Sequence, residues 1–182
     1  MVQRSLLVFE AHADDFELFA MSLLSLFDPV DVICVTRAYE LSRSAEFAKA
    51  AKALGYTAHT WNVADGCAKD HSLGTDMCSA IRNLRPYAVA THDPWKPYLL
   101  HADHRAVGTK VCDAITRLRA NNAYIPTELW LWNAGYANRR YTVAPETRTA
   151  AVSYYQSQPF LQTAHIPAVE EFRQILLTED FG

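Results

Sequence analysis

Several features are scarce in this chain of 182 residues, and each scarcity argues against a class of protein. Positive charge has no excess, because 17 Lys and Arg stand against 20 Asp and Glu, a formal net charge of −3. No basic stripe that could bind nucleic-acid phosphates is therefore expected, although the charge does not exclude binding of a small anionic ligand. The four cysteines form no C-x-x-C pair, which argues against a disulfide framework or a zinc ribbon. We expect Cys34 and Cys112, which lie in apolar patterns, to be buried and inert.

Long apolar runs are also missing. The stretch at 18–27 falls far short of the roughly 20 residues that a membrane span needs. The run at 6–9 is too short for the apolar region of a secretion signal, so we expect a cytoplasmic protein. No repeat, low-complexity tract or Gly/Ser/Pro-rich linker divides the sequence. We therefore expect one domain over residues 1–182.

The chain does contain a regular alternation of strand and helix patterns. Short apolar runs predict buried strands at residues 5–10, 31–36, 57–63 and 87–91. A predicted helix follows each of them, at 16–26, 42–54, 75–84 and 102–120. Strand followed by helix, four times over, favours an α/β fold with right-handed crossovers and a mostly parallel sheet covered on both faces.

Local signals set further boundaries. Ser42 is the expected N-cap of the second helix, and Gly55 supplies its stop. The last 60 or so residues are less regular. There we expect strands at 128–132 and 140–143 and helices near 146–156 and 168–177.

Two clusters of histidine and aspartate follow predicted strands. His12, Asp14 and Asp15 come directly after the first strand, and His101, Asp103 and His104 begin the helix after the fourth. In an open parallel sheet, ligands bind outside the carboxyl ends of the strands. We therefore expect the two clusters to converge.

The donor atoms of these clusters suit a zinc ion. Catalytic zinc takes three ligands from imidazole and carboxylate groups and leaves a fourth position for water. His12, Asp15 and His104 would supply such a His₂Asp set, which would also accept Fe²⁺ or Co²⁺. Asp14, beside a ligand but not obliged to be one, is the candidate base that takes a proton as water attacks a carbonyl.

The second cluster offers a further catalytic group. His101 stands one helical turn before His104, and if Asp103 orients and charges it, the imidazolium could stabilise an oxyanion and protonate a leaving amine. The alternative is that these are helix-capping and solvated residues, because Asp is ordinary in a first helical turn.

The paired motifs His12-Ala13-Asp14-Asp15 and His101-Ala102-Asp103-His104 resemble those of the LmbE-like, or PIG-L, zinc-dependent N-deacetylases. Weaker supporting segments lie elsewhere in the chain: Arg43-Ser44-Ala45-Glu46, Asp65-Gly66, Arg85-Pro86 and Tyr155-Gln156-Ser157-Gln158. The resemblance implies a Rossmann-like, three-layer α/β/α fold with a mostly parallel sheet. It implies hydrolytic removal of an acyl group, usually acetyl, from the amino group of a glucosamine-type sugar or conjugate.

Carried over by position, the resemblance assigns a role to each motif residue. Zn²⁺ would be held by His12, Asp15 and His104, with Asp14 as general base and His101 as acid or oxyanion partner backed by Asp103. It also implies that Arg43 and Asp65 hold sugar hydroxyls; the other interpretation is a helix-start arginine and a turn aspartate. The sequence departs from the family pattern at Ala13, where Pro is commoner, and at the apolar Leu99-Leu100 before the second motif.

Other aromatic and histidine residues have weaker functional signals. Four aromatic residues could line a sugar-binding rim or serve packing: Trp95, Tyr98, Trp132 and Tyr136. We expect a structural role for His92, with a secondary role at the site left open. The remaining histidines, which have no partner cluster, are expected to be structural: His59, His71 and His165.

Three classes of function remain in view. The first is a cytoplasmic N-deacetylase acting on a small N-acylated amino sugar or conjugate, with no nucleic-acid partner and no membrane span; a homo-oligomer is compatible with the family. The second is an inactive Rossmann-like binding module that keeps the metal site. The third, a dinucleotide-dependent oxidoreductase, is disfavoured because no G-x-G-x-x-G follows the first strand.

Overall fold

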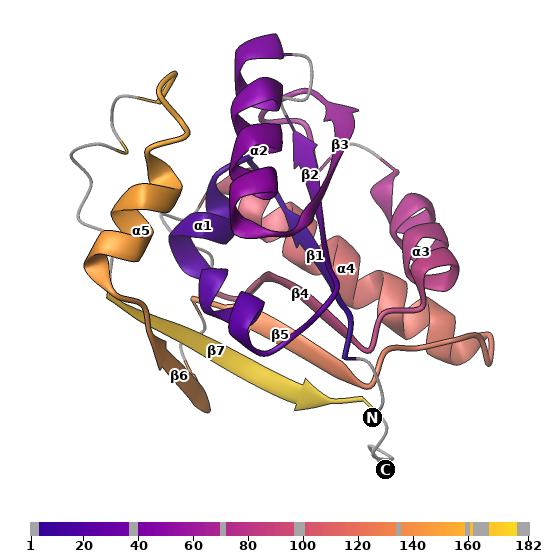
Figure 1. Cartoon of the computed structure of the whole chain (residues 1–182). Coiled ribbons are helices and arrows are strands. Elements are labelled where there is room, and N and C mark those ends of the chain that lie inside the picture. The colour runs from indigo at the N-terminus through magenta and orange to yellow at the C-terminus, as the bar shows by residue number, and fades with distance from the viewer. Residues whose placement is uncertain are drawn as a thin grey trace.

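The structure, a computed structural model, describes residues 4–36, 40–69, 72–96, 101–133, 136–158, 161 and 168–177 (Figure 1). Its first part repeats a strand and a helix: β1 (Leu6–Glu10), α1 (Asp15–Phe19), β2 (Val30–Thr36), α2 (Leu41–Leu54), β3 (Thr57–Val63), α3 (Leu73–Leu84), β4 (Ala88–His92) and α4 (Ala102–Ala120). A short 3-10 helix, η1 (Met21–Ser25), follows α1. The remaining elements are β5 (Glu128–Trp132), β6 (Arg139–Thr142), α5 (Pro145–Val152) and β7 (Val169–Leu176).

The strands of the described residues form one sheet in the order β3-β2-β1-β4-β5-β7-β6. The first five pair in parallel, and β7 runs antiparallel between β5 and β6. The expectation of a Rossmann-like α/β fold with a mostly parallel sheet is therefore confirmed. Since β1 and β4 are parallel neighbours in the sheet, their carboxyl ends lie side by side.

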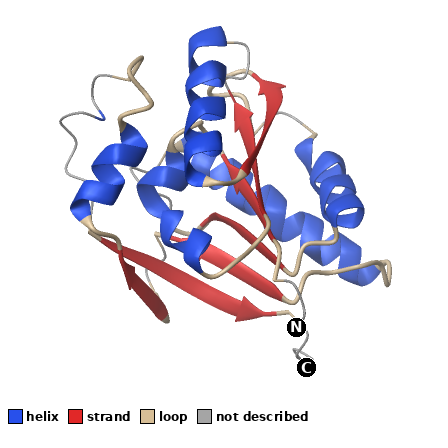
Figure 2. Cartoon of the chain, in the orientation of Figure 1, coloured by secondary structure: helices blue, strands red, loops and turns tan. Residues whose placement is uncertain are grey.

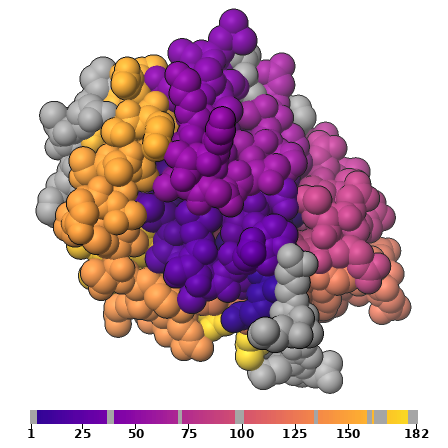
Figure 3. Space-filling model, in the orientation of Figure 1, coloured from indigo at the N-terminus to yellow at the C-terminus, as the bar shows by residue number. Residues whose placement is uncertain are grey.

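Helices cover both faces of the sheet, which gives three layers (Figures 1 and 2). On one face, α1, α2 and α5 pack on a cluster that includes Val8, Phe47 and Trp130. On the other, α3 and α4 pack on a cluster that includes Phe9 and Val111. Adjacent residues of β1 thus enter opposite cores, as the alternation of side chains along a strand requires. In Figure 3, α2 in purple lies between α5 in orange and α3 in pink.

Two predicted helices are wrong in the structure. The helix expected at 16–26 breaks into α1 and η1, because the Ser22 amide donates to the Glu170 carboxylate (3.0 Å) and the Leu18 carbonyl accepts from Arg148. The helix expected at 168–177 is strand β7. Its inward face includes the buried Glu170 beside Phe172, so a charged residue at a core position hides the two-residue period of the strand.

Smaller features follow the sequence more closely. Gly55 ends α2 with a φ of 82°, as its stop signal predicts, but the N-cap of this helix is Glu40 and not Ser42. Cys34 is buried, Cys112 is partly buried and Cys67 is exposed. Among the described residues, no helix is both long enough and apolar enough to cross a membrane.

Candidate metal centre and active site

The two motifs meet at the carboxyl edge of the sheet. The first occupies the turn between β1 and α1, and the second begins α4, whose N-cap is His101. Helix α4 comes very close to the end of β4 at Gly108, where a Cβ atom would lie 2.4 Å from the His92 carbonyl oxygen. Glycine therefore permits the approach that carries the second motif to the first.

The three predicted metal ligands bring their donor atoms together. His104 Nε2 lies 3.2 Å from His12 Nδ1 and 3.2 Å from Asp15 Oδ1. Asp15 Oδ2 lies 3.6 Å from His12 Nδ1. Ligands held about 2.0–2.1 Å from a tetrahedral zinc ion stand roughly 3.3–3.4 Å apart. The two 3.2 Å distances from His104 Nε2 fit such an ion, whereas His12 and Asp15 approach each other through the other carboxylate oxygen.

Hydrogen bonds behind the ligands fix which atoms face the centre. His12 Nε2 is 3.0 Å from Asp65 Oδ1, so a proton on Nε2 leaves the Nδ1 lone pair directed at the cluster. The His12 amide donates to Asp15 Oδ2 at 2.8 Å. The first motif therefore orders its own two ligands, and Asp65 from the loop after β3 orients one of them.

The charges around the centre favour a cation. Burial lowers the pKa of His12, but Asp103, Asp15 and Asp14 outweigh it and raise this pKa to about 10. Burial raises the pKa of Asp15, yet His104 and His92 hold it well below its usual range. The carboxylates thus stay ionised and attract positive charge to the point where the donor atoms converge.

Asp14 lies beside this centre and is buried. Its Oδ2 accepts from Arg43 Nη2 at 2.9 Å. Burial and the charge of Asp15 raise the pKa of Asp14 to about 6, although Arg43 opposes the shift. A carboxylate with a pKa near neutrality is suited to exchange protons at physiological pH.

The structure corrects the expected pairing of Asp103 with His101. The buried Asp103 carboxylate accepts from the amides of Gly66 (2.7 Å) and Ala68 (3.1 Å) and lies 3.7 Å from His12 Nε2. The His101 ring, at the N-cap of α4, accepts from the Asp103 amide, whereas the Asp103 carboxylate binds the amides of the loop after β3. Asp103 therefore supports His12 and the loop after β3.

The surroundings of His101 favour its neutral form. Its Nδ1 accepts from the Asp103 amide at 3.3 Å, which places the ring proton on Nε2. Burial and the nearby His12 and His104 lower the pKa of His101. The lowered pKa favours a neutral ring over the expected imidazolium, and a neutral ring can still donate from Nε2.

Arg43 and Asp65, expected at the sugar hydroxyls, both contact residues of the two motifs. The Arg43 side chain is buried against Asp14, whereas Asp65 binds His12 with 26% of its side chain exposed. These contacts give them positioning roles, and contact with a sugar stays a prediction.

Sequence reasoning missed two buried glutamates beside the first motif. Glu10 Oε2 accepts from the Phe16 amide at 2.9 Å and so bridges the two ends of the motif. Glu17, on α1, accepts from the Tyr56 hydroxyl. Their signal was a glutamate on each side of the motif within otherwise apolar runs.

His92 was assigned a structural role, with one at the site left open, and the structure places it at the centre. Its Nε2 is 3.2 Å from Asp15 Oδ2, and its ring stacks on His104. Trp132, which was considered for the sugar rim, is fully buried and donates to His92 Nδ1 at 3.1 Å. The available signal was the position of His92 at the end of a predicted strand.

Two of the other rim candidates, Trp95 and Tyr136, come together. Trp95 (67% exposed) and Tyr136 (86% exposed) line a pocket of about 500 Å³ with Asp93, Lys96 and Arg173. The Arg173 guanidinium lies 5.6 Å from the centre of the Trp95 ring. Exposed aromatic faces beside cations can hold a polar ring or an anionic group.

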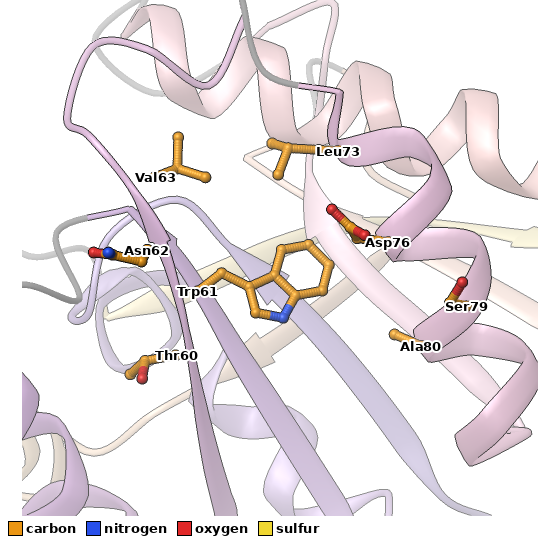
Figure 4. A pocket seen from close by; sticks show the side chains of 8 residues that line it. All are labelled: Thr60, Trp61, Asn62, Val63, Leu73, Asp76, Ser79 and Ala80. Carbon is orange, nitrogen blue, oxygen red and sulfur yellow. The ribbon is translucent and has the colours of Figure 1, made fainter.

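A separate pocket of about 650 Å³ lies between β3 and α3 (Figure 4). The Trp61 indole extends from β3 toward α3, which carries Asp76 and Ser79. None of its lining residues belongs to the two motifs.

Some sequence-based expectations lie outside the described residues: Tyr98, Leu99, Leu100, His71 and His165. They stay predictions.

Several solved structures have a similar fold. The N,N'-diacetylchitobiose deacetylase of Pyrococcus horikoshii has a TM-score of 0.75 and 19% identity, covering 96% of this chain and 85% of that one. A deacetylase of teicoplanin biosynthesis has a TM-score of 0.69 and 18% identity, covering 98% and 100%. GalB of Pseudomonas putida KT2440, a 4-carboxy-2-hydroxymuconate hydratase, has a TM-score of 0.71 and 15% identity, covering 99% and 100%. At these identities the likeness shows the fold, which accommodates more than one reaction.

Similarity at the level of sequence is confined to a family model. No curated protein matches the chain. The family model for PIG-L, described as GlcNAc-PI de-N-acetylase, matches residues 7–115. Because this match covers more than half of the 182 residues and contains both motifs, the chain belongs to the PIG-L family.

Proposed function

We propose that this protein is a metal-dependent hydrolase that removes an N-acyl group, with acetyl expected, from a glucosamine-type sugar or sugar conjugate. The observation that carries the proposal is the convergence of His12 Nδ1, Asp15 and His104 Nε2 within 3.2–3.6 Å of one another. Membership of the PIG-L family supports the deacetylase reaction.

The three ligands would hold a divalent cation of the zinc type. Zn²⁺ is the metal we expect, and Fe²⁺ or Co²⁺ suits the same donors. When bound, such a cation would supply Lewis acidity toward a carbonyl oxygen and toward water.

The residues around the ligands supply proton transfer. Asp14 takes a proton from the attacking water, since its pKa of about 6 leaves it ionised at neutral pH. Arg43 holds Asp14 Oδ2 and thereby fixes the direction of this base. His101 donates from Nε2 to the developing oxyanion. The C–N bond then breaks, the amine nitrogen gains a proton, and the acyl group leaves as a carboxylate.

The rest of the substrate has a candidate site beyond the end of β4. Trp95 and Tyr136 offer exposed rings on which a sugar can stack, and Lys96 and Arg173 offer positive charge. We therefore expect the protein to prefer conjugates over free N-acetylglucosamine. A cytoplasmic location and a homo-oligomeric state stay predictions.

The experiment measures release of acetate from a panel of N-acetylglucosamine conjugates. We expect activity that a chelator abolishes and added Zn²⁺ restores. Asp14→Asn should keep the metal and lose about 10²–10⁴-fold in turnover, because it removes a base and not a ligand. Asp76→Asn, in the separate pocket between β3 and α3, is the matched control and should retain full activity.

Two results would contradict the proposal. Metal-loaded protein that releases no acetate from any conjugate would favour the inactive binding module. Undiminished turnover in Asp14→Asn would exclude this residue as the base.

A further inference from the structure

His92 lies at the centre of the site, although it belongs to neither motif. It is the last residue of β4 and is 1% exposed. Its ring stacks on His104 with the centroids 4.1 Å apart and an angle of 11° between the planes. By distance alone, His92 could join Asp15 and His104 as a third ligand. Two nearly parallel rings, however, direct their in-plane lone pairs along separate planes, so His92 and His104 cannot both bind one ion.

The neighbours of His92 determine where its proton lies. The Trp132 indole N–H, which can only donate, points at Nδ1 from 3.1 Å. Nε2 faces two groups, the Ala11 amide at 3.1 Å and Asp15 Oδ2 at 3.2 Å. With the proton on Nδ1, the N–H groups of His92 and Trp132 would face each other, and the Nε2 lone pair would face the Asp15 carboxylate. With the proton on Nε2, Nδ1 accepts from Trp132 and Nε2 donates to Asp15.

The second arrangement is the more stable. Each arrangement leaves one pair of donors facing each other, at Trp132 or at Ala11. Only the proton on Nε2 adds a hydrogen bond to an ionised carboxylate, and such bonds are stronger than neutral ones. Trp132 therefore offsets the opposing preference of the Ala11 amide, and the Asp15 carboxylate decides the tautomer, which makes His92 a donor to Asp15.

The bond from His92 controls which oxygen of Asp15 is available. Oδ2 accepts from the His12 amide (2.8 Å) and lies 3.2 Å from His92 Nε2, whereas Oδ1 lies 3.2 Å from His104 Nε2. Two donors on Oδ2 hold the carboxylate plane still and leave Oδ1 directed toward the other ligands.

We propose that His92 is a positioning residue that fixes the Asp15 carboxylate for metal binding, with Trp132 and Asp15 together holding the proton of His92 on Nε2. This inference rests on the metal site of the proposed function. Outer partners of this kind commonly change metal affinity by about 10- to 100-fold.

The test measures Co²⁺ and Zn²⁺ affinity of the metal-free protein by competition with a chromophoric chelator. His92→Phe keeps a ring on His104 and removes both nitrogens, and we expect it to weaken binding by about 10- to 100-fold. His92→Gln, whose side-chain amide can donate near the Nε2 position, should recover most of that loss. Trp132→Phe keeps a large ring but removes the indole N–H that favours the proton on Nε2 of His92. We expect it to give an intermediate metal affinity.

Two further measurements separate positioning from folding. Thermal unfolding of the metal-free variants shows whether each is folded, and the visible spectrum of bound Co²⁺ should change in His92→Phe. His59→Phe is the matched control, because His59 pairs with Asp31 (2.7 Å) on strands β3 and β2. It removes a comparable His–Asp contact and should leave metal affinity unchanged.

The results that would contradict the inference can be distinguished from one another. Wild-type affinity in folded His92→Phe would overturn the role of His92 while leaving the metal site intact. A His92→Gln variant that recovers nothing would overturn it as well, because the stacking and not the donor would then matter. Wild-type protein that binds neither metal would overturn the metal site of the proposed function, and this inference with it.

Discussion

Gly108 links the packing of α4 to the metal centre, so we expect Gly108→Ala to disturb both. A Cβ atom there would lie 2.4 Å from the His92 carbonyl oxygen and 3.2 Å from the Pro94 nitrogen, both in the backbone. To reach 3.0 Å from this oxygen, helix and strand must separate by 0.6 Å, and to reach 3.4 Å by 1.0 Å. His104 stands four residues earlier on the same face of α4 and moves with it.

The expected magnitudes follow from this displacement. Overpacking typically costs about 1–3 kcal/mol. Replacing glycine by alanine in a helix returns about 1 kcal/mol. The net loss is therefore up to about 2 kcal/mol, which lowers Tm by up to about 8 °C for a chain of this size. A shift approaching 1 Å also carries His104 away from Asp15 and His12, and misplacement of that size can cost about 100-fold in turnover.

The assay combines thermal unfolding of the metal-free protein with a Co²⁺ titration. Gly74→Ala is the matched control on α3, where the added Cβ would meet only the end of the Arg117 side chain at 3.2 Å. This control should be as stable as the wild type or slightly more so, and its metal affinity should not change. Equal stability and equal affinity of the two variants would refute the argument that the approach at Gly108 positions the second motif.

Three further predictions concern metal content, thiol reactivity and substrate binding. His12→Ala and His104→Ala should each lose the bound metal on dialysis, measured by elemental analysis; full metal content in either would place the metal elsewhere. Burial raises the pKa of Cys112 to about 11, so its alkylation rate should rise about tenfold per pH unit between pH 8 and 10, because the thiolate is the reacting form. The exposed Cys67 should react first at pH 8, and equal rates by mass spectrometry would contradict the difference. Trp95→Ala should raise KM for an N-acetylglucosamine conjugate by about fivefold with kcat unchanged; a loss in kcat alone would place Trp95 in the catalytic step.

Local patterns predicted the bounds of two strands, one half-exposed and one buried. Strands β3 and β5 have the predicted bounds, because β-branched and aromatic residues between turn signals need no knowledge of distant partners. Strand β7, in contrast, was predicted as a helix because a charged residue lies at one of its core positions. Its buried Glu170 is acceptable because Arg148 pairs with its carboxylate at 2.6 Å and the Ser22 amide donates to it at 3.0 Å, both from other parts of the sequence.

The candidate site was likewise only partly predictable from the sequence. The positions of His12, Asp15 and His104 after the first and fourth strands were enough to predict a common centre, because parallel strands bring their carboxyl ends to one edge. The partner of each side chain was not predictable. Asp103 contacts His12 and not His101, and Arg43 contacts Asp14, because the directions of side chains on separate elements depend on packing.

The sequence by itself therefore determined the fold class and the residues that meet at the edge of the sheet, because both follow from periodicity and spacing along the chain. Only the tertiary structure decided which atoms face the centre. His92 stacks on His104, accepts from Trp132 and contacts Asp15. The sequence separation of these pairs ranges from 12 to 77 positions. No local pattern encodes such contacts, because they exist only once the sheet and α4 have packed.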